Sequence, residues 1–189
     1  VAAEGAGELH ALLLLSSRRG DRSGEGDGGD GGEGEMDARR DAEDVWIACG
    51  ADSGRIYLWP LHGLPSSASD VQSRPALSLS GHEAAVLQLA RLPNTHPAVA
   101  AAAAEAGGAA AQLLVSASKD RSIRLWSIDT SAKHGSPLLS LPSAHRDAVR
   151  ALALIDGQLY STGRDKTLRL WERDESAAEA KGVKLSGQS

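Results

Sequence analysis

The sequence predicts an all-β antiparallel protein built from about three copies of one small unit. The first observation behind this prediction is a series of short apolar segments separated by turn residues, such as Lys119-Asp120-Arg121 and Asp156-Gly157. The second is an internal repeat in which serine, aspartate and tryptophan recur at constant spacing. A chain of 189 residues is long enough to bury a sizeable core between such strands.

The first unit is expected to span residues 1–80, with an acidic, glycine-rich insertion at residues 16–44. Residues 20–44 contain ten acidic residues, three arginines and no periodic apolar face, so burial cannot offset the entropy lost on ordering and we expect disorder. This stretch has a net charge of −7 and the whole chain −5, so the remainder is slightly basic. The expected strands are Leu9–Leu15, Val45–Gly50, Arg55–Leu61 and Ala76–Ser80.

The second unit is expected to span residues 81–143, with an alanine-rich insertion at residues 93–112. Gly107 and Gly108 interrupt the alanines, so we expect this insertion to be flexible and disordered rather than a stable helix. The expected strands are Ala84–Leu92, Leu113–Ser118, Ser122–Ile128 and Leu138–Leu141.

The third unit is expected to span residues 144–189, and it is the most compact of the three. The end of the chain, Leu185-Ser186-Gly187, resembles Leu79-Ser80-Gly81 at the end of the first unit. The sequence therefore holds about three units and stops where a fourth would start. The expected strands before this end are Ala148–Leu154, Gln158–Thr162 and Thr167–Trp171.

The repeat is clearest in the second and third units. In both, aspartate follows serine by four residues and tryptophan follows it by ten, and a histidine precedes a strand valine by four. The first unit fits loosely, because Trp59 matches while Cys49 and Ser53 occupy the serine and aspartate positions. The matching residues are His82, Ser116, Asp120 and Trp126 in the second unit and His145, Ser161, Asp165 and Trp171 in the third.

These residues resemble the WD40 repeat family, in Gly81-His82, Ala144-His145, the aspartate turns and the tryptophans. The family's usual aspartate after the tryptophan is replaced here by Ser127, Glu172 or Pro60. In that family each repeat is one blade of a β-propeller, so the resemblance implies a partial β-propeller of about three four-stranded blades. It also implies that the histidine, serine, aspartate and tryptophan of each good copy form a structural hydrogen-bonded set. A histidine held by an aspartate can donate onward to a serine, which can reach the indole N–H.

The same residue types give little support for catalysis. His82 and His145 recur at one position of a repeat, which favours a structural role over metal binding or general-base chemistry. The two aspartates belong to different blades, and the two serines lie in strands without a nucleophile elbow. One cysteine, Cys49, allows neither a disulfide framework nor a cysteine zinc site within this chain, and we expect it to be a small buried residue. We therefore expect no enzyme activity, no cofactor and no metal.

Function is expected on the propeller face that carries the connections between blades and the turns between second and third strands. A rigid face lined by separate loops suits a protein or peptide partner, and basic loops favour an acidic or phosphorylated one. Ordinary solvated turn residues are the alternative for each position. The main hypothesis is a non-catalytic scaffold or adaptor. The candidate residues, five of them basic, are Glu83, Lys119, Arg121, Arg146, Arg164 and Lys166.

Two other functional classes stay open. One is the propeller substrate-recognition domain of a larger enzyme, such as a ubiquitin ligase or a kinase. The other is an RNA-binding propeller, which the scarcity of aromatic residues for base stacking disfavours. The apolar runs are too short to span a membrane, and we expect an intracellular protein, cytoplasmic or nuclear.

The end blades of such an arc are expected to expose apolar faces, with Leu13, Ile47, Leu168 and Leu170 on them. Further blades from missing parts of a longer chain would cover these faces, or the chain would self-associate.

Overall fold

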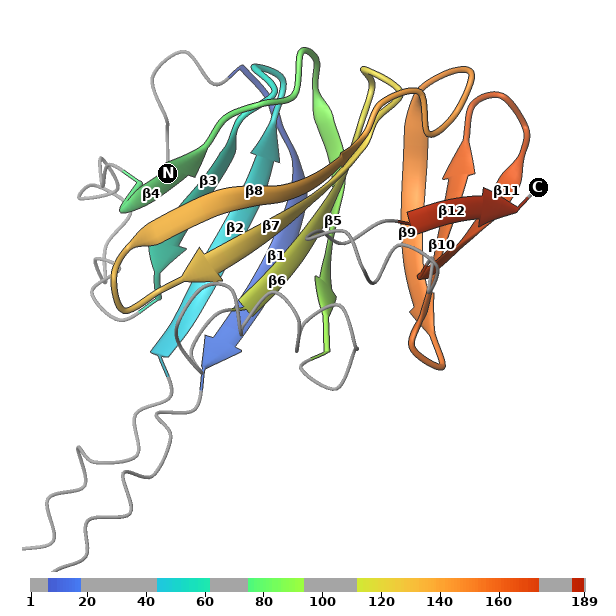
Figure 1. The fold of residues 1–189 in the computed structure, drawn as a ribbon. Coiled ribbons are helices and arrows are strands. Elements are labelled where there is room, and N and C mark those ends of the chain that lie inside the picture. The colour runs from blue at the N-terminus through green and yellow to red at the C-terminus, as the bar shows by residue number, and fades with distance from the viewer. Residues whose placement is uncertain (1–6, 18–43, 62–74, 94–111, 174–184, 189) are drawn as a thin grey trace, which may run out of the picture.

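The computed structural model describes residues 7–17, 44–61, 75–93, 112–173 and 185–188, and every regular element within these ranges is a β-strand. The strands form three antiparallel sheets of four strands each (Figure 1). Strand order in each sheet follows the chain, so every strand pairs with its neighbours in sequence. The predicted all-β class, with four-stranded blades of a partial propeller, is confirmed. No helix long and apolar enough to cross a bilayer occurs in the described residues.

The first sheet lies within residues 1–80. The pairs Ser16–Val45 and Ser17–Asp44 extend the ladder between its first two strands, so these strands include end residues that we had assigned to the insertion 16–44. Residues 18–43, which contain most of the expected disordered segment, lie outside the described part of the chain. The strands are β1 (Leu9–Ser17), β2 (Asp44–Ala51), β3 (Ile56–Pro60) and β4 (Leu77–Leu79).

The second sheet lies within residues 81–143. Its fourth strand begins at His134, four residues before the expected start, because pairing with the third strand continues to Asp129. This strand tolerates Pro137 because it is the outer strand of the sheet. Residues 94–111 of the expected insertion 93–112 lie outside the described residues, and Gln112 already belongs to a strand. The strands are β5 (Val86–Leu92), β6 (Gln112–Ser118), β7 (Ile123–Asp129) and β8 (His134–Leu141).

The third sheet lies within residues 144–189. Its fourth strand pairs with the third through Leu170–Gln188 to Arg173–Leu185, so the end of the sequence completes this sheet. The strands are β9 (Val149–Ile155), β10 (Gln158–Gly163), β11 (Leu168–Arg173) and β12 (Leu185–Gln188).

Two apolar cores join the sheets face to face. Side chains alternate between the two faces of a strand, so each sheet can pack on a neighbour at either side. Leu58 of the first sheet packs with Leu89 and Trp126 of the second, and Leu125 of the second packs with Leu152 and Trp171 of the third. Fully burying one such aliphatic side chain stabilises the fold by about 1.5–3 kcal/mol.

The alternation also corrects one expected exposed residue, because Leu13 packs against the core between the first and second sheets. Ile47 pairs with Leu14 and lies on the exposed face of the first sheet as expected, half-buried beside the cluster that contains Cys49. The exposed leucines of β1 are instead its neighbours Leu12 and Leu14. Leu168 is exposed, as expected, whereas Leu170, which was expected to be exposed as well, is half-buried.

Candidate functional site

A buried polar set crosses the second sheet. The indole Nε1 of Trp126 donates to Ser116 Oγ at 2.8 Å, and Ser116 Oγ lies 2.7 Å from Nε2 of His82. The other ring nitrogen, Nδ1, lies 2.8 Å from Asp120 Oδ2. An ionised carboxylate only accepts, so Nδ1 carries the proton, and in a neutral ring Nε2 then accepts from the serine hydroxyl. The serine is thus the donor to the histidine, the reverse of the direction that we expected.

The third sheet repeats this set. Trp171 Nε1 donates to Ser161 Oγ at 2.8 Å, and Ser161 Oγ lies 2.7 Å from Nε2 of His145. Nδ1 of His145 lies 3.0 and 3.1 Å from the two carboxylate oxygens of Asp165. In both sets the histidine side chain is completely inaccessible to solvent.

Each set has a fifth member that the sequence analysis missed. The hydroxyl of Ser122 donates to Asp120 at 2.6 Å and lies 3.0 Å from Nδ1 of His82. The hydroxyl of Thr167 donates to Asp165 at 2.8 Å and lies 3.0 Å from Nδ1 of His145. The signal was present, since a hydroxyl residue follows the aspartate by two positions in both copies.

Hydrogen bonds hold both aspartates in the charged form. Burial by itself raises the pKa of Asp120, but donors from His82 and from the hydroxyl and N–H of Ser122 outweigh it and hold that pKa well below its usual range. Burial also raises the pKa of Asp165, and donors from Arg146, Thr167 and His145 again outweigh it and lower that pKa. The two carboxylates therefore stay ionised at neutral pH.

The same carboxylates anchor the connections that enter each sheet. The N–H of Glu83 donates to Asp120 at 3.0 Å, and the N–H of Arg146 donates to Asp165 at 2.8 Å. A further backbone bond runs from the N–H of His145 to the carbonyl of Arg121 at 3.2 Å, and it ties neighbouring sheets together at this end. The buried sets thus fix the backbone positions of the surface loops above them.

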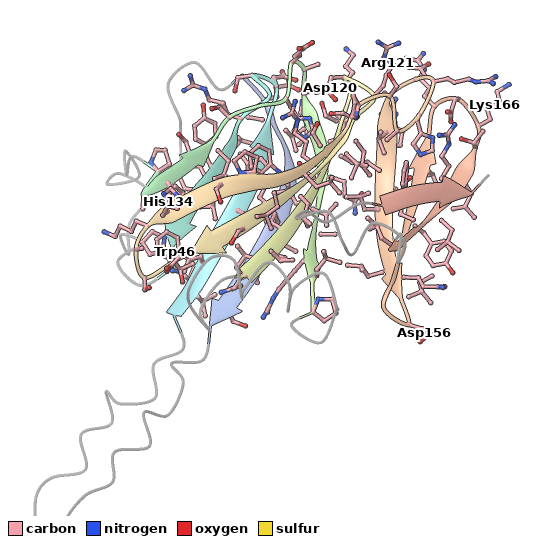
Figure 2. The ribbon with its side chains drawn as sticks, viewed as in Figure 1. Trp46, Asp120, Arg121, His134, Asp156 and Lys166 are labelled. Carbon is pink, nitrogen blue, oxygen red and sulfur yellow. The ribbon has the colours of Figure 1, made fainter. Side chains whose placement is uncertain are left out.

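We call this end of the molecule the turn face. Figure 2 shows Asp120, Arg121 and Lys166 at this same end of the molecule, with Asp156 at the opposite end. All five basic candidates are exposed there, and in the described part of the chain none of them forms an ion pair or a side-chain hydrogen bond. The candidate residues of the turn face are Glu83, Lys119, Arg121, Arg146, Arg164 and Lys166.

Two of the basic residues occupy a backbone conformation that disfavours a side chain. The turns between second and third strands have the same bonds in all three sheets, so Gly54, Arg121 and Lys166 are equivalent. Their φ angles are +76°, +73° and +64°, in the left-handed region where a residue with a Cβ costs roughly 1–2 kcal/mol. The second and third sheets therefore carry a basic side chain where glycine fits best.

The first sheet carries different chemistry at equivalent positions. Asp52 stands where the other sheets have Lys119 and Arg164, as the equivalent bond from its N–H to the Glu8 carbonyl shows. A hydrogen bond from His10 lowers the pKa of Asp52, so an ionised carboxylate stands here in place of a basic side chain. Cys49 replaces the serine of the polar set, and burial raises the pKa of its thiol.

Glu8, His10 and Asp52 also form a group with metal-ligating atoms close together. All three are exposed, and the imidazole and carboxylate of His10 and Asp52 already satisfy each other by a hydrogen bond. We assign no metal to this group.

Comparison with known families gives one match. The family model described as "WD domain, G-beta repeat" matches residues 73–127 and 135–172, and no curated protein matches the chain. Each matched segment takes in the outer strand of one sheet and the first three strands of the next. WD40 repeats in general form propellers that act as protein-interaction scaffolds. Because they also contain both complete polar sets, the two matched segments are repeats of the WD40 family.

Proposed function

We propose that this chain is a non-catalytic interaction module that binds an acidic protein segment on its turn face. The observation that carries the proposal is a set of five exposed basic side chains, from the loops of two neighbouring sheets, that form no ion pair within the described residues. Their guanidinium and ammonium groups suit carboxylates or phosphates, which accept charge-assisted hydrogen bonds.

The strained turns support a binding role for Arg121 and Lys166. A side chain at positive φ costs stability, and the equivalent glycine in the first sheet avoids that cost. Basic side chains retained at this cost fit a functional use on the surface better than a structural one.

The buried sets support a structural rather than catalytic role for the histidines. A general base must reach the proton that it abstracts, directly or through one water. The side chains of His82 and His145 have no solvent exposure, and their ring nitrogens already have partners within the set.

The test is a binding assay with labelled peptides of about ten residues. One peptide alternates Glu and Ser, a second carries phosphoserine in place of serine, and a third replaces every Glu by Lys. We expect the two acidic peptides to bind and the basic one not to bind. Removing both charges in the double variant R121G/K166G should weaken binding by about tenfold or more, because two charge-assisted contacts are lost. Added salt should weaken wild-type binding because the contacts are exposed.

A matched control is available in the same chain. Lys133 also has positive φ, at +50°, but it lies in the turn between β7 and β8, away from the turn face. K133G makes the same chemical change there and should leave peptide binding unchanged. Equal binding by wild type and R121G/K166G would contradict the turn-face proposal. Tight binding of single-stranded RNA with no binding of either acidic peptide would instead favour the RNA-binding alternative.

A further inference from the structure

The turn face changes the sign of its charge between the first and second sheets. Asp52, Lys119 and Arg164 are equivalent, because the N–H of each donates to a carbonyl of the connection that enters its own sheet, at 2.9, 2.9 and 2.8 Å. All three side chains are exposed. Lys119 belongs to the middle sheet, so this position is open to solvent even where a sheet packs on both sides.

The connections between the sheets show the same change of sign. Glu83 lies in the connection that enters the second sheet, and Arg146 lies in the connection that enters the third. The two are equivalent, because their N–H groups donate to Asp120 and Asp165, the aspartates of the two polar sets. Both side chains are exposed. A carboxylate therefore stands on one connection where the next carries a guanidinium group.

Turns and connections follow one another along the turn face. The turn of the first sheet lies against the connection that carries Glu83, since a Cβ on Gly54 would collide with the carbonyl oxygen of His82. The N–H of His145 donates to the carbonyl of Arg121 at 3.2 Å, so the next connection lies beside the turn of the second sheet. Carboxylates therefore come first along the face and basic groups follow, in the order Asp52, Glu83, Lys119, Arg146 and Arg164.

The two signs meet at the border between the first and second sheets. Hydrogen bonds from His10 and from the N–H of Glu8 lower the pKa of Asp52, and the positive charge of Lys119 lowers it as well. Asp52 is thus ionised at neutral pH and lies within electrostatic reach of the basic part of the face.

Two exposed charges run against this pattern. Arg55 is equivalent to Ser122 and Thr167, whose hydroxyls point inward to the polar sets. Asp147 follows a basic residue, and its carboxylate accepts from the N–H of Ala148 at 2.7 Å. With both included, the part of the face around the first sheet keeps a net negative charge and the remainder keeps a net positive one.

We propose that the partner segment bound on the turn face is bipolar, with its acidic part over the second and third sheets and a basic part over Asp52 and Glu83. This inference rests on the proposed function and specifies the partner further. An extended segment that continues toward the first sheet meets carboxylates, which attract lysine or arginine and repel glutamate or aspartate. The change of sign thus sets the position of the partner along the face.

The test compares three labelled peptides of about twelve residues on the whole chain. In the reference peptide one half alternates Glu with Ser and the other half alternates Gly with Ser. The block peptide has Lys in place of every Gly, and the interleaved peptide has the composition of the block peptide with Glu and Lys alternating along its length. Reference and block peptides are made in both chain directions, and the tighter direction of each is compared.

We expect the block peptide to bind about threefold more tightly than the reference peptide, because its lysines gain exposed ion pairs. The interleaved peptide should bind no more tightly than the reference peptide. D52N should reduce the advantage of the block peptide, and D52N/E83Q should abolish it. D156N makes the same change as D52N at an exposed aspartate at the opposite end of the molecule, and it should retain the full advantage.

Urea denaturation of each variant checks that the sheets remain folded. Equal binding of block and reference peptides by the wild type would overturn the bipolar partner and leave the turn-face proposal standing. An advantage that survives D52N/E83Q, or that the interleaved peptide shares, would also overturn it. Failure of the reference peptide to bind at all would overturn the turn-face proposal itself, and this inference with it.

Discussion

At the scale of single residues, the buried histidines concentrate the polar contacts of the core. His145 joins a carboxylate to a serine that in turn accepts from an indole, all away from water. Removing the ring leaves a buried hydroxyl and a buried carboxylate short of a partner, and unsatisfied buried groups are costly.

We therefore predict that H145A lowers the free energy of unfolding by about 1–3 kcal/mol. Urea denaturation measures this loss. H134A, at an exposed histidine at the start of β8, is the control and should leave stability unchanged. An H145A protein of wild-type stability that lost a measurable turnover would contradict the structural role.

Gln112 differs from the buried histidines because its polar atoms are buried without hydrogen-bond partners among the described residues. Its side chain is buried at the start of β6, and neither its amide nitrogen nor its amide oxygen has a hydrogen-bond partner in the part of the chain that the structure describes. Leucine of similar size would remove two unsatisfied groups, so we predict that Q112L raises the free energy of unfolding by about 1 kcal/mol. Q88L, at a half-buried glutamine of β5, serves as the comparison. A loss of stability in Q112L alone would show that the amide has a stabilising role.

At the scale of elements, one turn conformation occurs in three sequences. A Cβ on Gly54 would lie 2.3 Å from the carbonyl oxygen of His82, so glycine is required there by both φ and space. Lys166 adopts the same φ region without glycine. The turn is thus imposed by the sheet rather than by the local residue.

Substitutions at the equivalent positions Gly54 and Lys166 should change the free energy of unfolding in opposite directions. We predict that G54A lowers stability by about 1–3 kcal/mol, because the new methyl group meets backbone. K166G should raise stability by about 0.5 kcal/mol, since relief of strain exceeds the entropy that glycine adds to the unfolded chain. Thermal unfolding of both variants measures the pair. Destabilisation by K166G would mean that the lysine stem contributes more packing than its exposure suggests.

The sequence was sufficient to predict those strands that are bounded by recognisable turn residues. The aspartate turns and the serine-to-tryptophan spacing predicted the inner strands of the second and third sheets. It failed for β1, where Ala11–Leu15 is continuously apolar and no alternation says which side faces the core. The extra residue at the β-bulge between Leu9 and Ala11 also changes which side chains of β1 face the core on either side of the bulge. Ser122 and Thr167 were missed because a small hydroxyl residue in a turn is common without any buried partner.

At the scale of the whole molecule, the two buried carboxylates make stability depend on pH. Their pKa values are lower in the folded chain than in the unfolded chain, so the unfolded state takes up protons first as the pH falls. The stability that they contribute is complete above about pH 4, near the ordinary pKa of aspartate, and is lost progressively below it.

We predict that the urea midpoint of the wild type falls between about pH 4 and pH 3, and that D165N shows a smaller fall from a lower starting value. D156N, in the exposed turn between β9 and β10, should retain the full wild-type dependence. Parallel pH profiles for D165N and the wild type would contradict the assignment of acid sensitivity to the buried sets.

The offset between repeat and sheet has a consequence for how the molecule comes apart. Each matched segment of sequence supplies the outer strand of one sheet and the inner strands of the next. Adjacent sheets are therefore connected through a repeat that contributes strands to both. The third sheet cannot detach with its complete repeat unless β8 is peeled from β7 along the whole of their ladder. The unit that recurs in the sequence is therefore not the unit that unfolds, and disruption of one blade passes to its neighbour through a shared strand.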